Sequence, residues 1–370
     1  MIAFRIKQYI KMVFQNIVLP TIYYVYSRGK IDENLVVFAD AHHENLPYSM
    51  ETIYVEMKAK GYTVIDCFSD YKKSSMFDIF GSMLSFMRVY AKAKYVFICD
   101  NFLPVASCNK RKETEVIQLW HAGGILKKYA YDTERDIPKY YKSNVFKNYT
   151  LVTVSAEICR PVYVSAMRTG EKYIKATGLS RTDRFFQREY FKNCVEEFYA
   201  QYPKALGKKI VLWAPTFRGN AGNPKLVGYE EVAKLQEQLG EDWFVLMKVH
   251  PHIDTIKKVS NCDIQTERLL PVIDVLISDY SSVIFDYILL DKPLVLYVPD
   301  LKEFQSKNEL YIEFDELPGR VVEKKQELLR AVFEESESFD LKKIQCFKDK
   351  FMGACDGNAT YKILKLLNVK

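Results

Sequence analysis

The chain has 370 residues, of which 48% are hydrophobic and 27% are charged. This is the composition of a folded globular protein, and the length exceeds one ordinary hydrophobic core, so we expect two domains. The net charge of +6 is too small to indicate nucleic-acid binding, but it suits an anionic ligand or an anionic membrane surface. The eight cysteines are scattered without a Cys-x-x-Cys pair, which is typical of reduced thiols in a cytosolic protein.

The N-terminal residues 1–30 have the pattern of an amphipathic helix that lies on a membrane. Basic residues at Arg5, Lys7 and Lys11 face away from a stripe of apolar residues at helical spacing. The uncharged run 12–26 is shorter than the roughly 20 residues that a spanning helix needs, and no cleavage site follows it. The alternative is a first helix that docks on the core. The stripe consists of Ile2, Ile6, Tyr9, Ile10, Val13 and Ile17.

Apolar strand-like runs alternate with helix-like stretches in the first half of the chain. The runs are apolar throughout, as in parallel strands that are covered on both faces, so we expect a doubly wound parallel sheet. The expected strands are Leu35–Phe38, Thr63–Phe68, Tyr95–Cys99, Val116–Trp120 and Leu151–Val154, and the expected helices are Tyr48–Lys60 and Met76–Ala91.

The same pattern restarts after a charged and aromatic stretch at 181–209, in which we expect a helix at 186–202. The expected fold class is therefore α/β, with two doubly wound parallel-sheet domains that face a cleft. The last helix could cross back to the first domain. The expected second-half elements are the strands Ile210–Trp213, Trp243–Lys248, Val272–Ile277 and Leu294–Tyr297, and the helices Ser281–Leu290 and Ala359–Leu367.

The segment Trp120–Lys128 combines residue types that suit a phosphorylated substrate. A histidine can accept a proton near neutral pH, and glycine lets a substrate approach the backbone closely. We therefore predict that His121 is a general base and that a lysine contacts phosphate. The alternatives are a core histidine beside Trp120 and a solvated lysine face. The other candidates in the segment are Gly123, Gly124, Lys127 and Lys128.

Three strand ends of the second half carry further candidates. Ligands of open α/β sheets bind there, an arginine can grip a phosphate with two hydrogen bonds, and a helix start offers free N–H groups. We predict that these residues hold a diphosphate. The alternatives are that Arg218 bridges the domains and that Asp279 or Ser281 only caps a helix. The candidates are Thr216 and Arg218, then Lys248 and His250, then Ser278, Asp279, Ser281 and Ser282.

Other site classes are disfavoured. His250 and His252 are close enough to share a metal, but no nearby cysteine or acid completes a site, so we predict none. The chain lacks G-x-G-x-x-G and G-x-x-x-x-G-K-[ST], which argues against a Rossmann dehydrogenase and a P-loop enzyme.

Together these segments resemble the CDP-glycerol glycerophosphotransferase family of teichoic acid synthesis. The stretch Ala122–Ile125 differs from the WHGTPLKK-like segment of the polymerases and looks more like the primases, which add the first unit to a lipid-linked disaccharide. The matching segments, in the family's order, are Trp120-His121 with Gly124 and Lys127-Lys128; Thr177-Gly178 with Arg181 and Asp183; Ala214–Arg218; Lys248 with His250-Pro251; Ser278–Ser282 with Phe285-Asp286; Leu317-Pro318-Gly319; and Asp356–Ala359.

The resemblance implies a GT-B fold, with an acceptor-side domain at 31–180, a nucleotide-donor domain at 181–355 and a C-terminal helix at 356–370. It implies an enzyme without a cofactor that transfers glycerol phosphate from CDP-glycerol to a hydroxyl of a lipid-linked saccharide and releases CMP. It also implies peripheral attachment to the cytoplasmic side of a bacterial cell membrane.

The resemblance also assigns residue roles. His121 matches the proposed base, His250 and Arg218 are the other catalytic candidates, and Arg181 and Asp286 join the donor-binding set. Three alternatives remain open: a CDP-ribitol phosphotransferase, a sugar-nucleotide glycosyltransferase of the same fold, and an inactive membrane adaptor.

Overall fold

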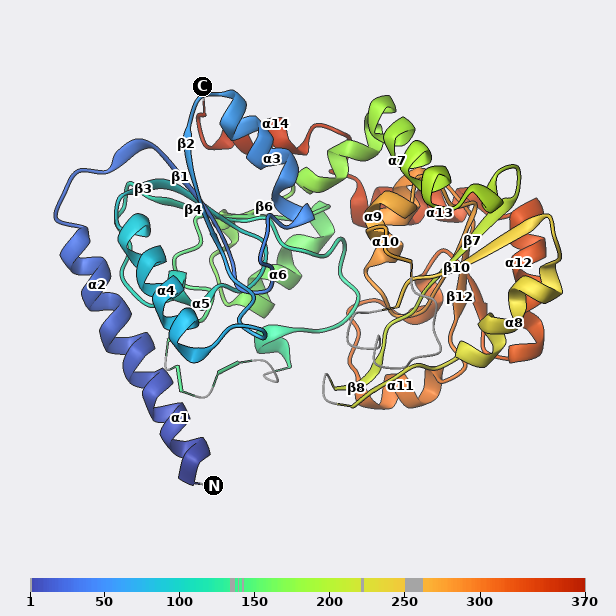
Figure 1. Cartoon of the computed structure of the whole chain (residues 1–370), viewed down its shortest axis with the longest axis horizontal. Coiled ribbons are helices and arrows are strands. Elements are labelled where there is room, and N and C mark those ends of the chain that lie inside the picture. Colours follow the sequence, from blue (N-terminus) through green and yellow to red (C-terminus); the bar gives the residue numbers. More distant parts are fainter. Residues whose placement is uncertain are drawn as a thin grey trace. The chain divides into compact units, whose positions relative to one another are not determined.

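The computed structural model describes residues 2–133, 137–138, 140–141, 143–220, 223–249 and 262–369. The chain forms two compact units, each built on its own sheet (Figure 1). The first unit comprises Met1–His121, Tyr129–Asp183 and Ala354–Lys370, and the second comprises Ala122–Lys128 and Arg184–Gly353.

The sheet of the first unit has six parallel strands in the order β2-β1-β3-β4-β5-β6. The order reverses between β1 and β3, which makes this the switch point of a doubly wound sheet. The expected strands are all present, and the two-residue β6 is too short to leave a sequence signal. The strands are β1 (Asp32–Asp40), β2 (Thr63–Phe68), β3 (Ala93–Ile98), β4 (Glu115–Gln118), β5 (Leu151–Thr153) and β6 (Ile174–Lys175).

Helices cover both faces of this sheet. Met50 and Ile53 pack with the sheet core on one face, and Ile363 and Leu364 of the last helix join the same cluster. The Asp183 carboxylate accepts hydrogen bonds from the first amides of that last helix, so the chain end belongs to this unit. The helices are α1 (Ile2–Val13), α2 (Leu19–Tyr26), α3 (Tyr48–Ala59), α4 (Met76–Tyr90), α5 (Leu103–Ala106), α6 (Arg160–Met167) and α14 (Ala359–Leu366); a π-helical turn (Phe14–Val18) joins α1 to α2, and 3₁₀ turns lie at Ala130–Asp132, Glu157–Cys159, Glu171–Tyr173 and Ser180–Phe186.

The second unit repeats the architecture with five parallel strands in the order β10-β7-β11-β12-β13. The helix expected at 281–290 begins two residues later and ends in a 3₁₀ turn. Its elements are β7 (Lys209–Ala214), β10 (Trp243–Met247), β11 (Val275–Ser278), β12 (Leu294–Tyr297), β13 (Arg320–Val322), the antiparallel pair β8 (Arg218–Asn220) and β9 (Asn223–Lys225), α7 (Arg188–Gln201), α8 (Tyr229–Leu239), α9 (Thr266–Leu269), α10 (Val283–Tyr287), α11 (Leu301–Lys307), α12 (Leu328–Glu337), α13 (Leu341–Met352), and the 3₁₀ turns Pro203–Ala205, Ile288–Leu290, Phe314–Glu316 and Lys325–Glu327.

The segment Ala122–Lys128 groups with the second unit, whereas the sequence analysis assigned it to the first domain. Its backbone explains this: Lys128 N–H donates to the carbonyl of Glu309 at 2.9 Å, and Tyr311 N–H donates to that of Leu126 at 2.8 Å. Among the described helices, none has the length and hydropathy required to cross a bilayer.

Gly124 fits this segment against Phe285 of α10. Its φ is +56°, and a Cβ there would lie 2.1 Å from the Phe285 ring. That ring is fully buried and has Phe347 as a neighbour, so it has no room to withdraw. Gly124 was expected to let a substrate approach the backbone. In the structure, the space beside Gly124 is filled by the Phe285 ring.

A matched pair of glycine substitutions separates this steric contact from backbone strain. Gly207 also has a positive φ, +77°, but nothing lies within 4 Å of its Cβ position. We expect Gly207→Ala to cost about 1–2 kcal/mol through its left-handed backbone, and Gly124→Ala to cost about 1–3 kcal/mol more through overpacking. Urea unfolding of both variants measures the difference, and equal losses would contradict the packing role of Gly124.

Candidate functional site

The carboxyl ends of β1, β3 and β4 gather histidines and aspartates in the first unit. β1 ends at Asp40, and His42 and His43 follow it directly. Asp100 comes after β3, and His121 comes after β4. Because β1 and β3 flank the switch point of the sheet, this cluster lies where open α/β sheets bind their ligands.

His121 lies beside a carboxylate that the sequence analysis did not identify. Its Nδ1 is 3.4 Å from Oδ2 of Asp100, and the same oxygen is 3.6 Å from Nε2 of His42. The His121 side chain is 50% exposed. A sequence signal did exist, since Asp40 and Asp100 each end an apolar strand run. Whether two such strand ends lie side by side depends on the order of the strands in the sheet.

The turn that carries His121 is held by the end of β4. Trp120 has a φ of +56°, unusual for a residue with a side chain, and its ring stacks on the His121 ring with centroids 4.8 Å apart. The fully buried Gln118 accepts a hydrogen bond from the Trp120 N–H at 3.0 Å. These contacts hold the backbone from which the His121 side chain extends.

Asp40 and His43 form a separate pair at the end of β1. Oδ2 of the buried Asp40 lies 2.8 Å from Nδ1 of His43 and accepts a hydrogen bond from the His42 N–H. Burial acts to raise the pKa of Asp40, but the bonds from His43 and His42 outweigh it and keep the pKa below its ordinary 3.8. The same bond raises the pKa of His43 above 6.5. The His42 N–H bond to Asp40 therefore fixes the loop that carries His42, and the His43 ring is a separate partner of the same carboxylate.

In the second unit, Arg218 lies between two aspartates instead of in an open position. Its guanidinium is 2.7 Å from Asp300 and 3.0 Å from Asp279, which follow β12 and β11. The rings of Tyr280 and Phe304 lie beside the same guanidinium. Burial acts to lower the pKa of Arg218, but the carboxylates outweigh it and raise the pKa. Arg218 was predicted to grip phosphate; in the structure its charge is used inside the protein.

Ser278 and Asp279, which were predicted to bind the donor, are buried and make hydrogen bonds within the protein. The buried Ser278 hydroxyl donates to the carbonyl of Ala214 at 2.8 Å. Asp279 accepts hydrogen bonds from the N–H groups of Thr216 and Tyr280 at 2.8 and 2.6 Å. Both residues therefore hold the loops after β7 and β11 in place, and Thr216 takes part through its backbone.

Lys127 is the predicted phosphate contact that keeps an unpaired charge within the described part of the chain. It is half-buried, and burial lowers its pKa, while the charge of Asp279 acts to raise the pKa and that of Arg218 acts to lower it. Lys128, by contrast, lies 3.4 Å from Glu309. An anion beside Lys127 would offset the burial of its ammonium group.

The other predicted donor residues lie in several places. Ser281 and Ser282 are half-buried at the start of α10, where the Ser281 hydroxyl accepts from the Val283 N–H at 3.3 Å. Asp286 is buried beside the Gly123 backbone. The remaining residues are Lys248, which donates to the carbonyl of Cys262; Arg181, which is buried in the first unit near the Trp120 carbonyl; and His250, which lies outside the described residues.

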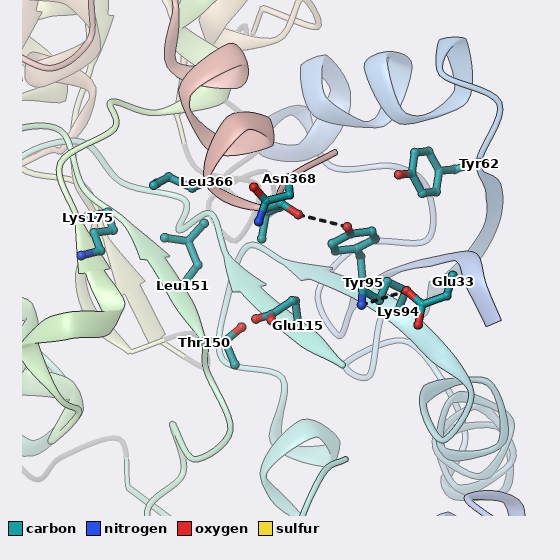
Figure 2. A pocket seen from close by; sticks show the side chains of 11 residues that line it. Glu33, Tyr62, Lys94, Tyr95, Glu115, Thr150, Leu151, Lys175, Leu366 and Asn368 are labelled. Atoms are coloured by element: carbon teal, nitrogen blue, oxygen red, sulfur yellow. Dashed lines mark hydrogen bonds and ion pairs between the residues drawn. The ribbon is translucent and has the colours of Figure 1, made fainter. Parts of the chain in front are cut away.

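Among the described residues, neither a metal cluster nor a cavity of the first unit coincides with these candidates. Within the described ranges, no group of three or more His, Cys, Asp or Glu side chains is arranged to hold a metal ion. A cavity of about 630 Å³ lies in the first unit at the amino ends of its strands (Figure 2). Glu33 and Lys94 pair across its wall at 2.8 Å, and the Tyr95 hydroxyl donates to the Leu367 carbonyl. None of the predicted site residues lines it.

The N-terminal helices pack on the unit through a face that the sequence analysis did not single out. The buried face consists of Gln15, Leu19 and Tyr23, and Gln15 donates to the Leu103 carbonyl at 2.9 Å. Four residues of the predicted apolar stripe are exposed, and Val13 is half-buried. Its exposed members, with the neighbouring Tyr24, are 43 to 65% exposed: Ile6, Tyr9, Ile10, Ile17 and Tyr24.

Substitution of Arg218 distinguishes an internal clamp from a phosphate contact. We expect Arg218→Ala to lower the free energy of unfolding by about 3–5 kcal/mol, because it leaves the buried Asp279 and the partly buried Asp300 without their cation. The control is Arg268→Ala, which removes a partly exposed pair with Glu197 and should cost less than about 1 kcal/mol. Equal stability of Arg218→Ala and wild type, together with weaker nucleotide binding, would contradict the clamp.

Comparison with known proteins agrees with the predicted family. The family model CDP-Glycerol:Poly(glycerophosphate) glycerophosphotransferase matches residues 21–368. The chain is 33% identical over 292 residues to the teichoic acid glycerol-phosphate primase of Bacillus subtilis (strain 168), covering 74% of this chain and 73% of the primase. It is 31% identical over 360 residues to the teichoic acid poly(ribitol-phosphate) polymerase of Bacillus spizizenii, covering 92% of this chain but 57% of the polymerase.

The fold is also that of a solved relative. The structure of the wall teichoic acid polymerase TagF is similar to this chain with a TM-score of 0.78 at 20% identity, covering 99% of this chain and 97% of the other. This likeness confirms the predicted α/β, GT-B-like fold class with its parallel sheets. From the match over residues 21–368 and the primase relative, this chain belongs to the CDP-glycerol:poly(glycerophosphate) glycerophosphotransferase family.

Proposed function

We propose that this chain transfers glycerol phosphate from CDP-glycerol to a hydroxyl of a lipid-linked saccharide in teichoic acid synthesis and releases CMP. Family membership supports the reaction class. One structural observation carries the proposal furthest: the half-exposed His121 imidazole at the carboxyl end of β4, with Asp100 beside its Nδ1. Within the described residues, its Nε2 has no hydrogen bond or ion pair, so it can accept a proton from an acceptor hydroxyl.

The proposed chemistry is a single in-line displacement at phosphorus. His121 takes the proton of the acceptor hydroxyl, the oxygen attacks the phosphorus that carries glycerol, and CMP leaves with the electron pair of the broken P–O bond. Positioning and electrostatic stabilisation supply most of the acceleration in such transfers. In this proposal Lys127 and the start of α10 offset the charge on the donor phosphates, and Arg218 positions the loops around them.

CDP-ribitol is the second candidate donor. The observation that favours it is the 31% identity to a poly(ribitol-phosphate) polymerase over 92% of this chain. Both polyols share the phosphate chemistry at which His121 would act, so they differ only in the pocket that receives the polyol.

Nucleotide release tests the function and its base together. The purified chain is incubated with a lipid-linked disaccharide and CDP-glycerol, CDP-ribitol or a UDP-hexose, and the released CMP or UDP is measured. We expect CMP release with a CDP-polyol, and His121→Ala should lower turnover by about 10²- to 10⁴-fold, the usual contribution of a general base.

The matched control for this assay is His43→Ala, because His43 is a nearby exposed imidazole that faces a different carboxylate. It should retain wild-type turnover. UDP release would favour a glycosyltransferase, no release of either nucleotide would favour an inactive adaptor, and a His121→Ala enzyme within threefold of wild type would exclude His121 as the base.

We also propose that the exposed stripe of α1 and α2 attaches the chain to the anionic cytoplasmic face of the membrane. The stripe is apolar and exposed while another face of the same helices packs on the protein. Residues 1–30 contain basic side chains and no acidic one, which suits anionic headgroups. A lipid-linked acceptor would then lie at the same surface as the enzyme.

Three substitutions in the stripe test the attachment. The triple variant Ile6→Gln, Ile10→Gln, Ile17→Gln removes exposed apolar area without changing charge, and we expect its affinity for anionic vesicles to fall about tenfold or more. The control triple, Val55→Gln, Val195→Gln, Leu206→Gln, removes exposed apolar residues elsewhere and should float like wild type. If both triples float equally well, the stripe is not the membrane contact.

A further inference from the structure

Asp100 is fixed more firmly than a surface carboxylate. Its Oδ1 accepts a hydrogen bond from the Asn101 N–H at 2.6 Å, and its Oδ2 faces both His121 and His42. Its main-chain carbonyl accepts from the side-chain amide of Gln118 at 2.9 Å. The carboxylate therefore has one defined direction, toward the two imidazoles.

Gln118 links this carboxylate to the histidine turn. Its amide N–H₂ bonds the Asp100 carbonyl, and its amide oxygen accepts from the Trp120 N–H at 3.0 Å. Gln118 is fully buried at the last position of β4. One buried side chain thus sets the spacing between the Asp100 carboxylate and the His121 ring, as expected for a pair that must keep its geometry.

The geometry identifies which imidazole nitrogen is available. A neutral imidazole carries one N–H, and a carboxylate beside Nδ1 favours the tautomer with the proton there. The lone pair is then on Nε2, which is the nitrogen of His121 without a partner among the described residues. When His121 has taken a proton, the same carboxylate offsets the charge of the imidazolium.

We infer that Asp100 is a positioning residue for the transfer: it holds His121 in the Nδ1–H tautomer so that Nε2 removes the acceptor proton. This inference rests on the proposed function. In the step, the acceptor O–H bond breaks and its proton goes to Nε2 of His121. The O–P bond forms, the P–O bond to CMP breaks with its electrons on CMP, and the proton on His121 afterwards goes to solvent.

His42 has a smaller part in this arrangement. Its Nε2 is 3.6 Å from the same Oδ2 of Asp100, so it helps to orient the carboxylate, which the Asn101 N–H also holds. His43 is directed to Asp40 instead. The inference therefore predicts effects of different size for the three histidines. His121 contacts the substrate, His42 acts only through Asp100, and His43 contacts neither the substrate nor Asp100.

The kinetic test is a ranked series of variants in the full chain. We expect Asp100→Asn to lower kcat by roughly 10²- to 10⁴-fold with the KM for the CDP-polyol within threefold of wild type. Asp100→Glu should have a kcat at least tenfold higher than that of Asp100→Asn. His42→Ala should lower kcat by about two- to tenfold, and His43→Ala should keep kcat within twofold of wild type. In a His121→Ala background, Asp100→Asn should cost no further activity, because the two residues act as a unit.

A merely structural Asp100 would give another result. It would lower kcat and thermal stability together, gain nothing from Glu, and add its full cost to that of His121→Ala. An Asp100→Asn enzyme within threefold of an active wild type would overturn the inference while leaving the proposed function intact. An inactive wild type would instead refute the proposed function.

A second measurement needs no activity. In ¹⁵N NMR of the five histidines, assigned by single substitutions, neutral His121 of the wild type should show the Nδ1–H tautomer, and Asp100→Asn should shift it toward Nε2–H. The His43 signals should not change. If wild-type His121 is already Nε2–H, or if its tautomer is the same in both proteins, the inference is wrong.

Discussion

When both faces of a parallel sheet are covered, polar functional residues can lie only at the ends of its strands. In this chain every strand of the two main sheets runs parallel to its neighbours, so the carboxyl ends of a unit's strands meet along one edge. The central strands β3 and β11 are largely apolar and buried, and the aspartates Asp100 and Asp279 follow them. The candidate residues are therefore grouped by sheet topology, and their distances in the sequence matter little.

The two sheet edges stabilise their charged residues in different ways. At the edge of the second unit, Arg218 is paired with both Asp279 and Asp300, so its positive charge stabilises the loops that carry these carboxylates. At the edge of the first unit, the His121 imidazole stays half exposed beside Asp100. The first edge thus presents a half-exposed imidazole, whereas at the second edge Lys127 has no ion pair among the described residues.

Local pattern was sufficient to predict most of the fold. Apolar runs such as 35–38 and 294–297 identified the strands, because burial on both faces leaves no alternation to confuse with a helix. β6 was missed because two residues carry no pattern. The family followed from the order of the motifs. The location of His121 after a strand was also predicted, and its role as a base stays a prediction.

Long-range contacts explain what could not be predicted. Asp100 and His42 were missed because their proximity to His121 depends on β1, β3 and β4 being neighbours. The pairing of Arg218 with Asp300 was not anticipated because the two residues lie 82 positions apart in the chain. Gly124 was assigned to substrate approach because nothing in the segment 120–128 indicates the Phe285 ring. In each case the residue type was noticed or noticeable, but its partner was set by the tertiary structure.

The central claim is that His121 acts as a base in one direct displacement and forms no covalent phosphohistidine. The stereochemistry at phosphorus tests this most directly. A CDP-polyol made chiral with sulfur at the phosphorus that bears the polyol is used as donor, and the configuration of the transferred phosphorothioate is determined. A single in-line attack predicts inversion; retention would show two displacements through an enzyme-bound intermediate and would contradict the role assigned to His121.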